Sequence, residues 1–101
     1  MLSIIITTFH EPGIRKAIDA VLGQELPEDY ELIVAAPDKE TEKIVVEYKK
    51  SNSKIKYFRD PGRGKSFAMN LLFKEARGDI LIFTDGDIYL SQNAINEILN
   101  E

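Results

Sequence analysis

Two acids separated by one glycine, Asp85-Gly86-Asp87, are the residues of this chain whose types and spacing best suit chemistry. They follow the apolar run 80–84, whose β-branched and aromatic residues are typical of a buried strand. Because a backbone that turns at Gly86 can aim both carboxylates into one crevice, the pair can offer two oxygen ligands to one ion. Such ligands suit Mg²⁺ or Mn²⁺, which usually also takes oxygens from a substrate phosphate. A loop with two solvated acids is the alternative, since Asp and Gly both favour turns.

The composition excludes several other kinds of site and partner. The 101 residues are 44% hydrophobic and 30% charged, with a net charge of -4 and no cysteine, which rules out disulfides and zinc–thiolate sites. Lys and Arg are scattered rather than gathered in a stripe, so we expect no nucleic-acid partner. We find neither a signal peptide nor an apolar stretch near the roughly 20 residues that span a bilayer. We therefore expect a cytoplasmic protein without a membrane segment.

Strand and helix patterns alternate along the chain. Strand patterns lie at 2–8, 30–36, 55–58 and 80–84, and each is followed by a helical pattern. Because right-handed crossovers dominate, this alternation predicts a Rossmann-like, three-layer α/β/α fold with a four-stranded parallel sheet of order 3-2-1-4. We expect one domain over residues 1–101. In such sheets ligands bind beyond the carboxyl ends of the strands where the order reverses, so segment 7–11 should meet the two acids.

Other polar residues have less specific signals. His10, the only histidine, and Glu11 follow the first predicted strand, and Glu11 suits either a helix start or a ribose hydroxyl. Asp38 is a plausible helix N-cap. Arg63 and Lys65 lie near a predicted helix start, where they form a candidate anion site.

The segment Gly64-Lys65-Ser66 also invites comparison with a phosphate-binding P-loop. The pattern G-x-x-x-x-G-K-[ST] would place its first glycine at position 59, which is an arginine here. The loop would also follow the third strand, with only one helix between it and the acid Asp85. We therefore favour the simpler anion site. The first loop lacks G-x-G-x-x-G, which weighs against a dinucleotide enzyme.

Four segments in the right order resemble family 2 glycosyltransferases, which have the GT-A fold. They are 3–11 (similar to "SIIIPTYNE"), 17–24 ("SVLAQ"), 62–70 ("GKGAALN") and 76–87 ("ARGDIIVFLDAD"). Together they extend over the chain from end to end. The resemblance implies that the chain is the donor-binding half of a GT-A domain, a truncated form of it.

The resemblance also implies roles for individual residues. The nucleotide-binding positions would be Thr8, Phe9, Glu11, Asp38, Arg63, Lys65 and Asp85. Asp85 and Asp87 would hold the Mn²⁺ or Mg²⁺ that bridges the diphosphate of a nucleotide-diphosphate sugar, commonly a uridine one. In the family, an acidic residue after the second strand recognises the nucleobase. Its only counterpart here is Asp38, which is shifted toward a helix start.

In the family, the catalytic base and the acceptor-binding residues follow the D-x-D motif. We therefore assign no catalytic residue, leave the acceptor open (glycan, lipid or protein), and expect the 101-residue chain to be inactive alone. The fourth strand would leave an unpaired edge, which predicts self-association. Other functions stay open: a sugar-phosphate nucleotidyltransferase, a P-loop-like nucleotide-binding enzyme, or a catalytically silent self-associating module.

Overall fold

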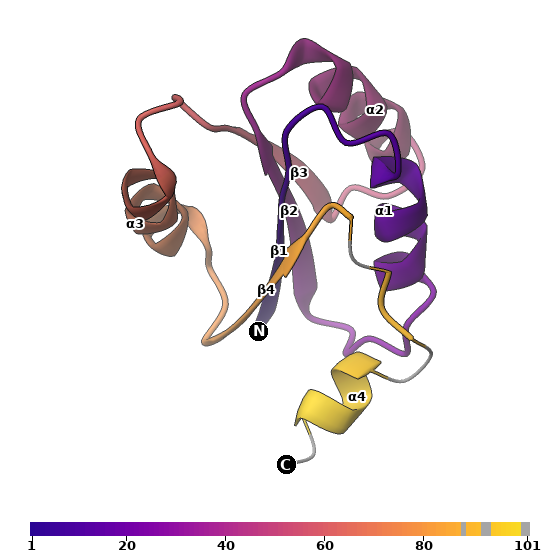
Figure 1. The fold of residues 1–101 in the computed structure, drawn as a ribbon. Helices are drawn as coiled ribbons and strands as arrows, with labels where there is room; N and C mark the ends of the chain where they lie inside the picture. Colours follow the sequence, from indigo (N-terminus) through magenta and orange to yellow (C-terminus); the bar gives the residue numbers. More distant parts are fainter. Residues whose placement is uncertain (88, 92–93, 100–101) are drawn as a thin grey trace.

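The computed structural model describes residues 1–87, 89–91 and 94–99, with the side chain of Lys65 excepted. The elements follow one another as β1 (Leu2–Thr7), α1 (Ile14–Leu22), β2 (Tyr30–Ala36), α2 (Lys39–Lys49), β3 (Ile55–Arg59), α3 (Lys65–Glu75), β4 (Ile80–Asp85) and α4 (Ala94–Leu99). The strands pair in parallel in the order β3-β2-β1-β4, with α1 and α2 on one face and α3 on the other (Figure 1). The predicted layers and strand order are confirmed.

The apolar runs of the two central strands are buried on both faces. Even-numbered residues such as Ile4, Ile6 and Val34 pack toward α1 and α2, together with Ile95 of α4. Odd-numbered residues such as Ile5 and Ile33 pack on the other face, against α3. Continuous runs rather than alternating ones are what a strand with helices on both faces requires.

Helix α3 covers its face of the sheet thinly. The helical spacing of the sequence predicts that Phe67, Ala68, Leu71 and Leu72 share its buried face. Ala68 and Leu72 are buried, but Phe67 is 39% exposed and Phe73 is 55% exposed. The prediction that Phe67 is buried was therefore wrong. Its ring instead lies under the guanidinium of Arg63, with 4.9 Å between the guanidinium carbon and the ring centroid.

A buried carboxylate joins three strands near their amino ends. Glu31 of β2 is 2% exposed, and its Oε1 accepts a hydrogen bond from Lys56 Nζ of β3 at 2.8 Å. Its Oε2 accepts from Ser3 Oγ of β1 at 2.6 Å and from the backbone N–H of Arg77 at 2.7 Å. Glu31 therefore ties β1, β2 and β3 to the segment that leads into β4.

Ser3 extends this network to the start of β4. Its Oγ accepts a hydrogen bond from the backbone N–H of Gly78 at 2.8 Å. A Cβ at position 78 would clash with Ser3 Oγ and with the backbone of Met1, so glycine is needed for this close approach. The network fixes where the chain enters β4, and hence which residue of β4 lies beside each residue of β1.

The protonation of Glu31 links this network to pH. Burial raises the pKa of Glu31, but the hydrogen bonds from Lys56, Ser3 and the Arg77 amide outweigh burial and hold the pKa below its ordinary 4.5. Because the pKa is lower in the folded chain than in the unfolded one, the carboxylate contributes stability that is present above the unfolded pKa. That contribution is lost as the pH falls through the folded pKa.

We predict that Glu31→Gln lowers the free energy of unfolding at pH 7 by about 3 kcal/mol, because it leaves the Lys56 ammonium without its charged partner. The difference from the wild type should shrink as the pH falls below 4.5, the ordinary pKa of this side chain. Urea unfolding at pH 7 and at lower pH measures both effects. Glu75→Gln, at the exposed end of α3, is the matched control and should change stability by less than about 0.5 kcal/mol. Equal stability of the Glu31→Gln variant and the wild type at pH 7 would contradict the prediction.

Candidate functional site

A cavity of about 460 Å³ lies where the strands end and α3 begins. This volume falls within the range of about 300–1,000 Å³ that is typical of small-molecule sites. The lining includes Thr8, Phe9 and Asp85, which were all predicted from the sequence, together with Thr7, Pro37, Asp60, Gly62, Gly64, Ala68 and Met69. The structure thus brings the segment after β1 and the end of β4 together, as the strand order predicts.

The first acid of the pair is held by the neighbouring strand. Asp85 is the last residue of β4 and lies beside Thr7 in the register of β1 and β4. Thr7 Oγ1 donates a hydrogen bond to Asp85 Oδ1 at 3.1 Å, and Oδ2 has no hydrogen bond within the described part of the chain. Asp85 is exposed, so this second oxygen is available to a ligand.

The turn between the acids is fixed by a close approach. The backbone N–H of Gly86 donates to Thr7 O at 3.0 Å, and a Cβ at Gly86 would clash with the side chain of Thr8. Asp87 follows the turn and is exposed. Within the residues that the structure describes, each of the two carboxylates has an oxygen that accepts no hydrogen bond. Such a pair fits an ion such as Mg²⁺ or Mn²⁺, which commonly binds one or two carboxylates together with phosphate oxygens.

The chain after the two acids is anchored to α1. At the start of α1, the ring of Tyr89 lies so close to Gly13 that a Cβ there would clash with it, and Lys16 Nζ is 4.8 Å from its centroid. Just after α1 and its C-cap Gly23, the buried Gln24 donates from Nε2 to Ser91 O at 2.7 Å and accepts at Oε1 from the N–H of Ile95 at 3.2 Å. Helix α1 and the turn that follows it therefore hold the segment that leaves the candidate metal site.

The wall of the cavity offers an exposed aromatic ring. Phe9 is 67% exposed and lies beside His10, with 4.5 Å between the ring centroids. Such a ring can stack on a nucleobase, whatever the identity of that base. Phe9 therefore lies where a base can reach it.

The loop that leads into α3 forms another part of the wall. Gly62 and Gly64 have φ angles of 74° and 101°, which favour glycine, and the helix N-cap Gly64 makes no side-chain capping bond. Arg63 packs on Phe67 and is not part of the cavity lining, so its contact with a nucleotide stays a prediction. The predicted contact of Lys65 falls on a side chain outside the described residues.

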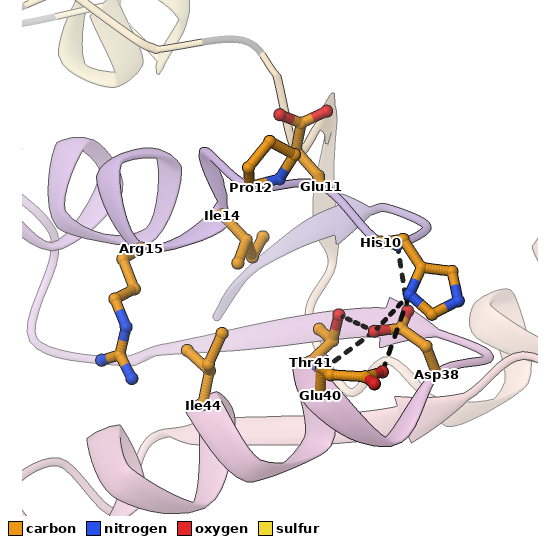
Figure 2. Close-up of a pocket in the computed structure, with 9 residues that line it drawn as sticks. All are labelled: His10, Glu11, Pro12, Ile14, Arg15, Asp38, Glu40, Thr41 and Ile44. Carbon is orange, nitrogen blue, oxygen red and sulfur yellow. Dashed lines mark hydrogen bonds and ion pairs between the residues drawn. The ribbon is translucent and has the colours of Figure 1, made fainter.

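Glu11 and Asp38 line a second cavity, of about 300 Å³, between the starts of α1 and α2 (Figure 2). Glu11 Oε1 accepts from the N–H of Gly13 at 3.1 Å, and its carboxylate points away from Asp38. The structure therefore does not bring these two predicted residues into the larger cavity with Asp85.

Asp38 is the N-cap of α2, the role that its position in the sequence suggested. Its Oδ2 accepts hydrogen bonds from the N–H of Thr41 at 3.0 Å and from Thr41 Oγ1 at 2.6 Å, and its Oδ1 accepts from the N–H of His10 at 3.2 Å. Burial raises the pKa of Asp38, but the bonds from Thr41 and His10 outweigh burial and lower the pKa below its ordinary value. The carboxylate is thus a structural anion that joins the first loop to α2.

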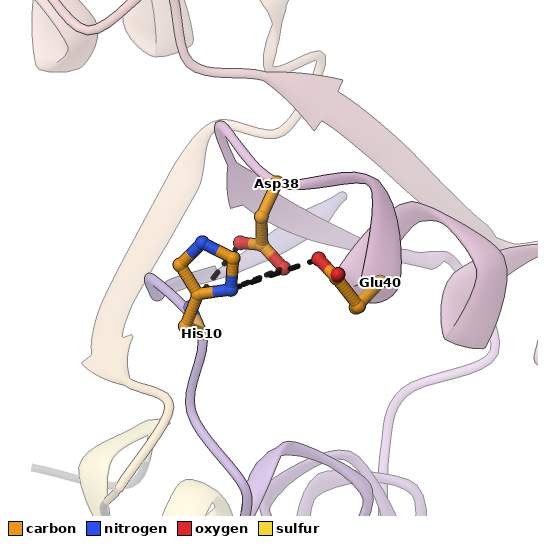
Figure 3. A group of neighbouring side chains, drawn as sticks. All are labelled: His10, Asp38 and Glu40. Carbon is orange, nitrogen blue, oxygen red and sulfur yellow. Dashed lines mark hydrogen bonds and ion pairs between the residues drawn. The ribbon is translucent and has the colours of Figure 1, made fainter.

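His10, Asp38 and Glu40 together could offer three ligand atoms to a metal ion (Figure 3). His10 Nδ1 is 3.8 Å from Asp38 Oδ2 and 3.6 Å from Glu40 Oε2. However, both oxygens of Asp38 already accept hydrogen bonds, and the start of α2 carries the positive end of the helix dipole, which disfavours a cation. Helix capping therefore accounts for this cluster without a metal.

Sequence reasoning placed Thr7 within the segment that meets the acids, but it missed Asp60 in the cavity lining and Gln24 and Tyr89 in the support of the acids. Asp60 had one available signal, because it opens the most turn-rich stretch of the chain and directly follows β3. Gln24 and Tyr89 had none, because their partners are remote in the sequence.

The family model described as Glycosyl transferase family 2 matches residues 3–101. The chain is 34% identical over 105 residues to the "uncharacterized glycosyltransferase EpsJ" of Bacillus subtilis (strain 168), in a match that covers 100% of this chain and 30% of EpsJ. The chain thus spans less than a third of the length of this curated relative.

Solved glycosyltransferase structures share the fold. The mannosyltransferase PcManGT from Pyrobaculum calidifontis, in complex with GDP-Man and Mn²⁺, superposes with a TM-score of 0.85 at 23% identity, over 97% of this chain and 31% of PcManGT. S. aureus TarS 1-349 in complex with UDP gives a TM-score of 0.76 at 19% identity, over 99% of this chain and 31% of TarS 1-349. These likenesses confirm the predicted GT-A fold. None of the helices in the described part of the chain has the length and apolar character of a membrane span.

We predict that Gln24→Ala lowers the free energy of unfolding by about 2 kcal/mol, because the carbonyl of Ser91 and the N–H of Ile95 lose their buried partner. Hydrogen exchange at the Ile95 amide should accelerate more than exchange in β1 and β2, since α4 is released first. Glu25→Ala, at the exposed neighbouring position, is the control and should leave both measurements near the wild-type values. Unchanged protection of Ile95 in the Gln24→Ala variant would show that this amide bridge does not hold α4.

Proposed function

The chain belongs to glycosyl transferase family 2, and we propose that it is the part of such an enzyme that binds a nucleotide-sugar donor together with a divalent cation. The observation that carries this proposal is the larger cavity, in which Thr8 and Phe9 from the end of β1 meet Asp85 from the end of β4. The relatives support it, because PcManGT is in complex with GDP-Man and Mn²⁺ and TarS with UDP.

Asp85 and Asp87 would hold Mn²⁺ or Mg²⁺, with the diphosphate beside them. Both side chains are exposed, and Asp85 keeps one oxygen free of hydrogen bonds within the described part of the chain, which supports this assignment. A divalent ion bound there supplies positive charge that stabilises a departing nucleoside diphosphate. The ion also adds positive charge to a chain whose net charge is -4, which favours an anionic donor.

The nucleoside would extend from the diphosphate along the ends of β1 and β2. Thr8 and Phe9 would contact it, with the Phe9 ring against the base. Arg63 and Lys65 would approach the diphosphate or the base from the start of α3. Contacts of Glu11 and Asp38 with the nucleotide stay predictions, and their hydrogen bonds within the second cavity favour a structural role for both.

The complete transfer reaction would need more protein than this chain contains. The match extends over 30% of EpsJ and 31% of PcManGT, and we propose that the catalytic base and the acceptor site lie in the remaining part of such proteins. The acceptor would be a glycan, lipid or protein, and the donor a uridine nucleotide sugar in the first instance. The 101-residue chain alone would bind the donor without transferring the sugar.

We predict that UDP binds the wild-type chain at least about tenfold more tightly with Mn²⁺ than without it, because the ion neutralises charge between the diphosphate and the two acids. Asp87→Asn should remove this Mn²⁺ dependence while leaving the fold intact, since Asp87 is exposed. Isothermal titration calorimetry measures both affinities.

Asp79→Asn is the matched control, because it removes the same charge at the amino end of β4, where the side chain is 92% exposed. This control should bind UDP as the wild type does. Binding that is indifferent to Mn²⁺, or an Asp87→Asn variant that keeps the full Mn²⁺ effect, would contradict the proposed site.

We also propose that the free edge of β4 pairs with a second copy of the chain. β4 lies at the edge of the sheet, Ile80 is 51% exposed at its start, and the half-exposed Phe73 packs on Phe83 beside it. Unpaired strand edges with apolar residues recruit other strands. Light scattering should therefore detect a mass that rises with concentration, and Ile80→Lys should keep the chain monomeric. A monodisperse wild-type monomer at all concentrations would overturn this proposal.

A further inference from the structure

We propose that Asp60 selects the base of the bound nucleotide by accepting a hydrogen bond from a ring N–H. Uracil and guanine carry this N–H, whereas cytosine and adenine have an acceptor nitrogen at the corresponding position. This inference rests on the proposed donor site and deepens it, because it names the class of nucleotide that the site takes.

Asp60 lies at the opposite end of the cavity from the candidate metal site. It directly follows β3, whereas Asp85 ends β4, and these are the two edge strands of the sheet. Both residues line the cavity. Three strand spacings of about 4.8 Å separate the two edges, or about 14 Å in total. A nucleoside diphosphate whose diphosphate lies near Asp85 would therefore extend its base toward Asp60.

The carboxylate of Asp60 is held in place and keeps one oxygen free. Its Oδ1 accepts a hydrogen bond from the backbone N–H of Gly62 at 2.8 Å, and its own N–H donates to Ala36 O at 3.0 Å. Within the described part of the chain, Oδ2 has no hydrogen-bond partner. An ionised carboxylate can only accept hydrogen bonds, so a base that binds here needs a donor.

Asp38, the acid expected to recognise the base from the end of β2, is not available for this role. Asp38 caps α2 with both oxygens engaged, and it lines the other cavity. At the end of β2 the larger cavity is lined by Pro37, which has neither a side-chain hydrogen-bonding group nor a backbone N–H. Within the described lining, Asp60 and Asp85 are the acids, and Asp85 lies at the metal end.

The chemistry of the base edge then gives the selectivity. Uracil offers N3–H, and guanine offers N1–H with the adjacent 2-amino group, which a carboxylate can accept together. Cytosine N3 and adenine N1 are acceptors, and a carboxylate repels them. Sites that hydrogen-bond a substrate N–H discriminate strongly against analogues that lack it.

The test is calorimetry in Mn²⁺ with UDP, GDP, CDP and ADP, on the wild type and on Asp60→Asn. An asparagine keeps the turn, because its carbonyl oxygen still accepts from Gly62, but it can present an amide donor in place of Oδ2. We expect the wild type to bind UDP or GDP at least about tenfold more tightly than CDP and ADP. Asp60→Asn should weaken the binding of the preferred nucleotide by a similar factor. The same variant should bind CDP with unchanged or higher affinity. Asp79→Asn is the control for loss of charge.

The outcomes separate this inference from the proposed function. The role of Asp60 is overturned if Mn²⁺-dependent binding is the same in the wild type and in Asp60→Asn, or if the variant loses affinity equally for all four nucleotides. Either result leaves the donor site standing. A wild type that prefers CDP or ADP also overturns it. If none of the four nucleotides binds with Mn²⁺, the donor site itself is refuted.

Discussion

The register between β1 and β4 is the constraint on which the rest of the structure depends. At one end it is set by the buried Glu31, which draws Ser3 and the segment before β4 together, and at the other by the contact of Gly86 with Thr8. A slip by one residue would turn the apolar side chains of β4 to the wrong faces. It would also move Asp85 away from Thr7, and the acid would lose both its hydrogen bond and its place in the cavity.

Two aspartates that follow neighbouring strands have different local roles because their surroundings differ. Asp38 begins a helix, and the N–H groups of that helix and of the first loop occupy its oxygens. Asp60 begins a turn at Pro61 and Gly62, which occupies one oxygen and leaves the other free within the described part of the chain. The local hydrogen bonds, rather than residue type or distance in the sequence, determine which acid can serve a ligand.

Much of the fold followed from the sequence, because alternating elements and right-handed crossovers leave few topologies. The same rules predicted that Thr8, Phe9 and Asp85 would meet, and the structure confirms this. The sequence could not predict that Phe67 is exposed, because the coverage of a face by α3 depends on tertiary packing. Nor could it predict the partners of Glu31 and Gln24, because a buried polar residue carries no periodic signal and its partners are remote in the chain.

Paramagnetic broadening by Mn²⁺ in the NMR spectrum of the ¹⁵N-labelled chain, with UDP present, tests most directly where the metal and donor bind. The effect falls steeply with distance, so substoichiometric Mn²⁺ reports which amides lie nearest the ion. The account predicts that the amides of Gly86 and Asp87 broaden first and that the amide of Thr41, beside the His10–Asp38–Glu40 cluster, broadens late. Early broadening at Thr41 with Gly86 unaffected would place the metal in the second cavity and contradict the account.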